Sequence, residues 1–167
     1  MGNVLKILDV IGYWSTIIVI IAFFVECGKW FMGISPALLR LGKGLASRKI
    51  AVFAEGDDFN SLRSLLVDSK LFKEKNVTQI TKCELKKAED FSLFLAHWKS
   101  ISSCLEDILS AKKDCTALVI YAPQKEGHLS SESIDKINEH RNVILVNFRG
   151  RLLNDIITSL ITTSYER

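Results

Sequence analysis

The sequence has few of the features that define metal-binding, disulfide-bonded or repetitive proteins. Its 167 residues include four cysteines, which form neither a CxxC pair nor a regular framework of spacings. We therefore interpret the cysteines as reduced thiols, as expected in a reducing compartment. His97 has no second ligand-type residue at the spacing of a metal site, so we expect no bound metal. Internal repeats and low-complexity tracts are also absent, and the length suits one compact domain or a smaller domain with an appendage.

A large excess of charge of one sign is also missing. The formal net charge is only +3, which does not give the basic footprint of a nucleic-acid-binding protein. We therefore expect no direct binding to nucleic acid. Most of the positive excess lies in one segment near the amino terminus, at Lys29, Arg40, Lys43, Arg48 and Lys49. Such a cluster suits contact with the anionic headgroups of membrane lipids.

What the sequence does contain is one long apolar run. Residues 10–25, VIGYWSTIIVIIAFFV, carry no charge, and the run extends to 5–31 if Asp9 and Glu26 lie near the bilayer surfaces. This exceeds the roughly 20 residues that a membrane-spanning helix needs. Aromatic residues of the kind found at membrane interfaces lie near both ends, at Tyr13, Trp14, Trp30 and Phe31. No small-x-small cleavage site follows, so we expect a retained anchor, with a buried core helix or a signal peptide as the alternatives.

The charges around the apolar run predict its orientation and the division of the chain. Positive residues gather after the run, and positively charged flanks stay on the cytoplasmic side. We therefore expect a single-pass membrane protein with its C-terminal domain in the cytoplasm. The predicted parts are an anchor over 1–32, a basic juxtamembrane connector over 33–48 and a cytosolic domain over 49–167. Within the connector, Ser35 and Pro36 predict a turn.

Strand-like and helix-like patterns alternate after the connector. Apolar runs predict five strands, at 49–55, 76–83, 91–98, 115–123 and 142–148. Helical spacing predicts four helices, at 57–72, 100–113, 130–140 and 150–165. Asp57 or Asp58 is expected to cap the first of them. This alternation predicts an α/β fold: a five-stranded, mainly parallel sheet in a flavodoxin-like or Rossmann-like three-layer sandwich.

The carboxyl ends of the predicted strands gather polar side chains. Ligands of such sheets bind at this edge, near the point where the strand order reverses. The residues that we expect to bind a ligand there are Glu55, Asp57, His97, Trp98, Gln124, Arg149 and Arg151. Both arginines flank a glycine where the last helix begins, so they favour an anion such as a phosphate. Solvated arginines, or arginines paired with acids elsewhere, are the alternative.

Residues 86–109, KKAEDFSLFLAHWKSISSCLEDIL, resemble the middle of Toll/interleukin-receptor domains. The resemblance implies that Asp90 begins a strand, that Cys104 stands for the cysteine of the family and that Glu106 stands for its glutamate. In enzymatic members that glutamate helps to cleave the nicotinamide–ribose bond of NAD. A glutamate on an exposed helix face is ordinarily solvated, and catalysis would require burial beside an apolar wall. Both interpretations of Glu106 remain open, and we favour a nonenzymatic protein.

The layout of the whole chain, one amino-terminal anchor followed by a basic connector and a cytosolic α/β domain, resembles the membrane effectors of bacterial antiviral systems. These include Rossmann-fold membrane proteins associated with CRISPR and membrane-anchored Toll/interleukin-receptor-like proteins. The resemblance implies that the protein lies in a bacterial inner membrane. It also implies a sensor and effector: its cytosolic domain binds a nucleotide-like ligand or a protein partner, and its anchors act as a homo-oligomer. Gly12, Ser15 and Thr16 offer small side chains for helix contact. The alternatives are a noncatalytic subunit that recruits a partner, encoded nearby, to the membrane, and a hydrolase of NAD. No cofactor is predicted apart from the nucleotide-like ligand.

Overall fold

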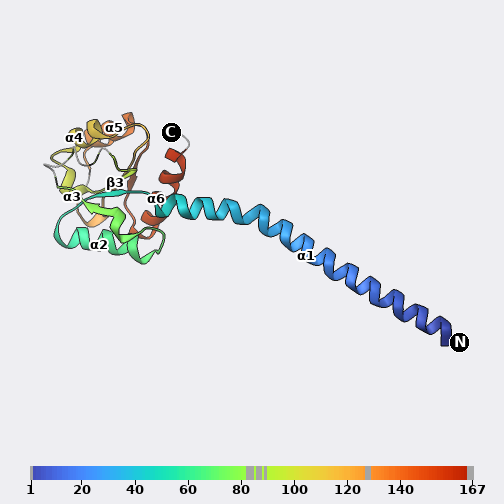
Figure 1. The fold of residues 1–167 in the computed structure, drawn as a ribbon. Helices are drawn as coiled ribbons and strands as arrows, with labels where there is room; N and C mark the ends of the chain where they lie inside the picture. Colours follow the sequence, from blue (N-terminus) through green and yellow to red (C-terminus); the bar gives the residue numbers. More distant parts are fainter. Residues whose placement is uncertain (1, 82–84, 86–87, 89, 127–128, 165–167) are drawn as a thin grey trace. The chain divides into compact units, whose positions relative to one another are not determined.

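The chain forms two compact units, Met1–Gly42 and Lys43–Arg167. The computed structural model describes residues 2–81, 85, 88, 90–126 and 129–164. The first unit is formed by most of α1, a helix of 45 residues over Gly2–Ala46. The second unit contains the last turn of α1 and all the strands, which are labelled in Figure 1 together with the other helices.

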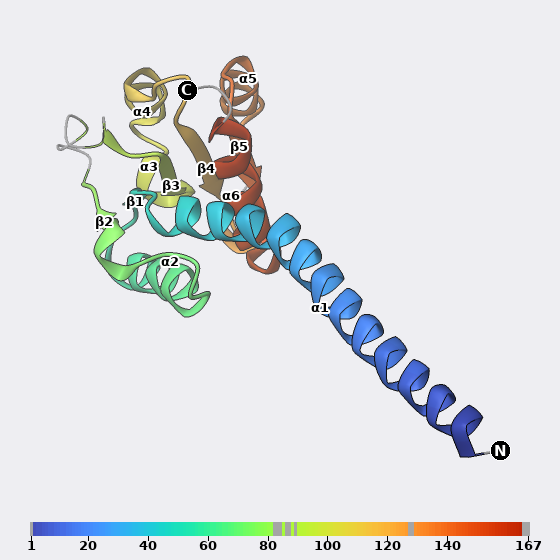
Figure 2. The same cartoon turned by 45° about the vertical axis from the view of Figure 1, so that its right-hand side comes forward.

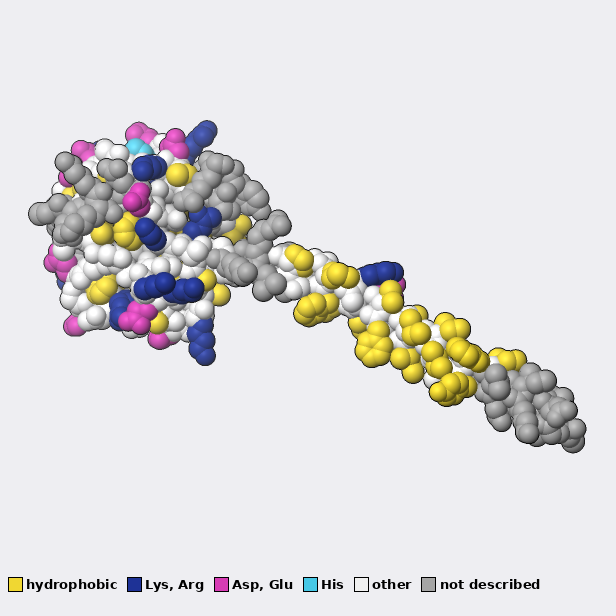
Figure 3. All heavy atoms as spheres, viewed as in Figure 1, with side chains coloured by type: hydrophobic (Ala, Val, Ile, Leu, Met, Phe, Trp, Pro, Cys, Tyr) yellow, Lys and Arg dark blue, Asp and Glu magenta, His cyan; other side chains and the backbone are white. Residues whose placement is uncertain are grey.

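Within α1, Ile11–Gly33 is long and apolar enough to cross a membrane. None of its most apolar window is buried in the described structure, so this stretch does not pack as the core helix of a globule. Figure 3 shows apolar side chains along this part of α1. Length and composition suit a membrane anchor and a signal sequence equally.

The turn predicted at Ser35 and Pro36 is wrong, because α1 continues through both residues. Proline lacks a backbone N–H, so Pro36 removes one hydrogen bond, to the carbonyl of residue 32. The residues that follow, ALLRL, are good helix formers and favour continuation of the helix beyond this missing bond. The predicted roles of residues 1–32 and 33–48 stay predictions.

The second unit contains a five-stranded sheet with the strand order β2-β1-β3-β4-β5. Its strands are β1 (Ile50–Phe53), β2 (Val77–Gln79), β3 (Leu93–His97), β4 (Ala117–Tyr121) and β5 (Val143–Val146). All neighbouring strands are parallel. The predicted flavodoxin-like α/β fold is therefore confirmed. β2 is shorter than the strand predicted over 76–83, of which residues 82 and 83 lie outside the described residues.

The helices of this unit follow the strands in the predicted alternation. They are α2 (Gly56–Asp68), α3 (Trp98–Ile101), α4 (Leu105–Ala111), α5 (Ser131–Glu139) and α6 (Arg149–Ser164), with single 3₁₀ turns η1 (Glu74–Asn76) and η3 (Gln124–Glu126). The single helix predicted over 100–113 is wrong, because α3 and α4 are separate. Ser102 and Ser103 lie between them, and serine side chains compete with helical backbone hydrogen bonding.

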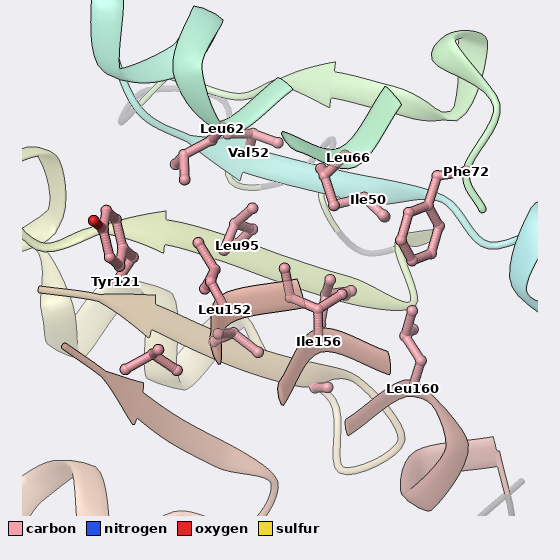
Figure 4. Packing of buried hydrophobic residues seen from close by; sticks show 14 of the residues in the cluster. Ile50, Val52, Leu62, Leu66, Phe72, Leu95, Tyr121, Leu152, Ile156 and Leu160 are labelled. Carbon is pink, nitrogen blue, oxygen red and sulfur yellow. The ribbon is translucent and has the colours of Figure 1, made fainter. Parts of the chain in front are cut away.

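Two apolar cores lie on opposite faces of the sheet. On one face, Leu62 and Leu66 of α2 and Leu152 and Ile156 of α6 pack against alternate strand residues such as Leu95. Figure 4 shows these side chains together on that face. The other face is covered by α3, α4 and α5, through Ile101, Ile108 and Ile137 among others. Figures 1 and 2 show α4 and α5 on the side of the sheet away from α2, which gives three layers.

Candidate functional site

A cavity of about 210 Å³ lies at the edge of the sheet where β3 and β4 end. Parallel strands bring their carboxyl ends to one edge, and this fold binds ligands where the order changes between β1 and β3. The helices after β1 and β5, α2 and α6, supply the other walls. The cavity is lined by Asp58, Ser61, Leu62, His97, Tyr121, Pro123 and Arg149.

The alternation of strand side chains places His97 on the side of the sheet that α2 and α6 cover. His97 follows Leu93 and Leu95 in β3 at a spacing of two residues, and these leucines belong to that core. The parallel register pairs His97 with Tyr121 of β4. Their rings lie edge to face, with centroids 5.6 Å apart. Figure 4 shows Tyr121 with its hydroxyl oxygen directed away from the core.

Asp58 brings a carboxylate to the buried imidazole of His97. Asp58 Oδ1 lies 3.9 Å from His97 Nε2, which is too long for a direct hydrogen bond. The His97 side chain is 3% exposed and that of Asp58 is 38% exposed, so the pair opens to solvent on the side of Asp58. The two side chains form an ion pair only when His97 is protonated.

The first turn of α2 has a different cap from the one predicted. Its N-cap is Glu55, whose side chain makes no capping hydrogen bond, so the prediction of a cap at Asp57 or Asp58 is wrong. Gly56 adopts a positive φ of 57°, which a glycine reaches without strain and which turns the chain from β1 into α2. Both aspartates therefore lie within the first turn, where a negative charge is favoured by the helix dipole.

Arg149 brings a positive charge to the same cavity from the start of α6. Its Nη2 donates a hydrogen bond of 2.8 Å to the backbone carbonyl of Ser61 in α2. This bond joins residues 88 positions apart in the sequence and fixes the guanidinium beside α2. The cavity is therefore lined by one carboxylate and one guanidinium from two different helices.

The other predicted ligand-binding residues do not line this cavity. Glu55 borders a separate space of about 10 Å³, which is no larger than one water molecule needs. Trp98 packs against the core on the other face of the sheet. The exposed residues Asp57, Gln124 and Arg151 are absent from the lining. Of the seven predicted residues, the structure brings together only His97 and Arg149, and a role in binding stays a prediction for all of them.

The residues expected to bind a ligand did not include three polar residues of the cavity: Asp58, Ser61 and Tyr121. A spacing of three residues places Asp58 and Ser61 on one face of a helix, which is a signal that the sequence provides. Tyr121 follows Ala117 and Val119 at alternate positions of its strand, so its orientation is equally predictable. The contact between α2 and α6 has no comparable signal, since Ser61 and Arg149 are far apart in the chain.

Glu106 lies elsewhere, beside a second, polar cavity of about 280 Å³ between α4 and α5. Its side chain is 73% exposed, and its Oε1 lies 2.6 Å from Lys136 Nζ. This hydrogen bond and the positive charge of Lys136 lower the pKa of Glu106 below its ordinary value. Burial beside an apolar wall, which catalysis would require, is not found at Glu106. Its catalytic role stays a prediction without support from its surroundings.

The chain matches no protein-family model, no curated protein and no solved structure. Two parts of the layout seen in the sequence are present: a parallel five-stranded α/β domain and one amino-terminal apolar helix. These findings identify no family, and a shared fold does not by itself define a function.

Proposed function

We propose that this protein is a membrane-anchored sensor whose α/β domain binds a small polar ligand and thereby controls the association of its anchors. The observation that carries this proposal is the cavity lined by Asp58, His97, Tyr121 and Arg149. It lies where flavodoxin-like sheets bind their ligands, and its polar groups come from four separate elements. Such convergence is typical of a binding site.

The charges of the cavity indicate the chemistry of the ligand. Arg149 suits an anionic group, while Asp58 accepts hydrogen bonds from N–H or O–H groups. Glu55 and Asp57 also lie at the start of α2 and add negative charge, which disfavours a chain of several phosphates. At about 30 Å³ per water molecule, 210 Å³ corresponds to about seven waters. The part of the ligand that enters the cavity is therefore small, such as the phosphate group of a nucleoside monophosphate.

The core of the domain connects this cavity to the end of α1. Leu62 and Tyr121 line the cavity and belong to the same apolar core as Leu45, which lies in the last turn of α1 and is 7% exposed. Asn76 donates a hydrogen bond of 2.8 Å to the carbonyl of Ala46 in the same turn. Since packed cores transmit displacements, a ligand that shifts Leu62 or Tyr121 also acts on this turn.

Binding by the full-length chain in lipid nanodiscs tests the proposal. Isothermal titration with AMP, NAD and inorganic phosphate would be compared between the parent and two variants, Arg149→Gln and Arg151→Gln. Both arginines are exposed on the first turn of α6, but only Arg149 lines the cavity. We expect Arg149→Gln to weaken binding of AMP about tenfold or more, as the loss of a charged hydrogen bond does. Arg151→Gln should bind as the parent does.

Two results would contradict the proposed site. Equal losses in both arginine variants would place the ligand elsewhere, and an absence of binding by all three probes would reject a nucleotide-like ligand. Extraction of cell membranes at alkaline pH tests the anchor separately, because a protein that spans the bilayer stays with the lipid. The assignment to bacterial antiviral defence depends on the resemblance alone and stays a prediction.

A further inference from the structure

One line of residues along the apolar part of α1 differs from the rest of the helix surface. Its members are spaced alternately by three and four residues, which is the spacing of a coiled-coil seam. They are Gly12, Ser15, Val19, Ala22, Glu26, Lys29 and Gly33. All seven are exposed, and all but Val19 are small or charged. We call this line the α1 seam.

Most of the remaining surface of the same stretch carries large apolar side chains, with Thr16, Cys27 and Gly28 as the exceptions. Trp14, Phe24 and Phe31, for example, are 60%, 67% and 66% exposed. Bulky side chains of this kind suit contact with lipid, whereas small residues allow two helices to approach closely. The seam is therefore the face of α1 that a second helix can approach most closely.

The seam carries one charged pair, Glu26 and Lys29, within the apolar part of α1. Glu26 Oε1 lies 2.7 Å from Lys29 Nζ, and the two side chains remain 72% and 64% exposed. A carboxylate and an ammonium group have several further positions for hydrogen bonds. Glu26 lies seven residues before the end of Ile11–Gly33, about 10 Å along the helix at a rise of about 1.5 Å per residue. Charged groups at such a depth ordinarily face another helix.

Each copy of the chain offers a negative and a positive group on adjacent layers of one seam. Copies of a single-pass protein have the same orientation, so their α1 helices are parallel. In a parallel pair, each seam residue lies in one layer with its own copy and also contacts the adjacent layers of the partner helix. Glu26 of each copy can then meet Lys29 of the other, so the seam is complementary to itself.

We propose that the α1 seam binds a second copy of this chain, with Glu26 of each helix paired to Lys29 of the other. This inference rests on the proposed function, because it requires that α1 crosses the membrane. Beyond the proposed function, the inference specifies the face of α1, the partner and the charged residues through which the anchors associate. The alternating spacing indicates a left-handed crossing of the two helices.

A charge-complementation experiment tests the seam. Full-length chains with donor and acceptor labels would be placed in liposomes, and association would be measured by energy transfer. Glu26→Lys and Lys29→Glu each leave two like charges on the seam, so we expect each variant alone to associate about tenfold more weakly than the parent, equivalent to about 1.4 kcal/mol. An equimolar mixture of the two variants restores opposite charges between copies and should associate within about threefold of the parent.

Three matched controls separate the seam from general effects on the helix. The doubly exchanged variant, Glu26→Lys with Lys29→Glu, keeps both charges and should associate as the parent does. Ala22→Leu enlarges a seam residue and should weaken association about tenfold, as the charge variants do. Ile21→Leu, next to the seam, should have no effect.

The outcomes distinguish this inference from the proposed function. If the mixture associates no better than the single variants, the pairing between copies is refuted even though the chain remains in the membrane. If Ala22→Leu and Ile21→Leu have equal effects, the seam is not the contact face. A parent chain that alkaline extraction releases from membranes would instead refute the membrane-anchored function itself.

Discussion

Two adjacent residues of the central strand test whether both faces of the sheet are covered. Phe94 and Leu95 follow each other in β3, so their side chains point to opposite faces. Phe94 is 1% exposed and belongs to the core under α3, α4 and α5, while Leu95 is 0% exposed and belongs to the core under α2 and α6. A sheet with one solvated face would bury only one of the two.

The expected magnitudes follow from this burial. Phe94→Ala and Leu95→Ala each remove a large buried side chain and leave a cavity, which costs about 3–5 kcal/mol of the free energy of unfolding. A domain of this size has a total stability of about 5–15 kcal/mol. Each substitution alone should therefore remove about a fifth or more of the stability and lower the thermal midpoint by about 10–20 °C.

Urea unfolding of the full-length chain in detergent, followed by circular dichroism, provides the measurement. A lower urea midpoint, with an unchanged dependence of the unfolding free energy on urea, would show that the stability itself has changed. Phe148→Ala is the matched control, because Phe148 is 57% exposed and its loss should change stability by no more than about 0.5 kcal/mol. If either core substitution costs less than about 1 kcal/mol, the corresponding face is not packed as the structure describes.

Three smaller changes test local features of the domain. Gly56→Ala should cost about 1–2 kcal/mol because its φ is 57°, whereas Gly150→Ala, where a Cβ meets nothing within 4 Å, should be neutral or slightly stabilising; thermal unfolding distinguishes them. Ser130→Ala removes the side-chain acceptor of the α5 N-cap and should cost about 1 kcal/mol in urea unfolding. The hydrogen bond and the charge of Lys136 lower the pKa of Glu106 below its ordinary value of 4.5. Their exposed pair therefore stabilises the fold slightly above pH 4.5, and this stabilisation is lost as the pH falls through the lowered pKa. Glu106→Gln should leave the thermal midpoint at pH 7 almost unchanged and remove this small pH dependence of the thermal midpoint.

The strands were predictable because their sequence signal is local. A parallel strand buried on both faces reads as a continuous apolar run, as LFLAH and ALVIY do in β3 and β4. The places where prediction failed depend on competing local preferences. Pro36 predicts a turn by itself, yet the helix formers around it sustain α1. At Ser102 and Ser103 the apolar spacing continues, but the serines end α3 before α4 begins.

The candidate site was less predictable, since it combines side chains from two helices and two strands that lie far apart in the sequence. Taken alone, the start of α6 with Arg149 and Arg151 predicts an anion site. In the fold, the hydrogen bond from Arg149 to Ser61 brings α6 to α2, whose first turn carries Asp57 and Asp58. The guanidinium of Arg149 then shares its cavity with the carboxylate of Asp58. A multiply charged anion is therefore attracted by Arg149 and repelled by the negative charge at the start of α2. The sheet order that joins these two helices therefore favours a ligand that satisfies both charges.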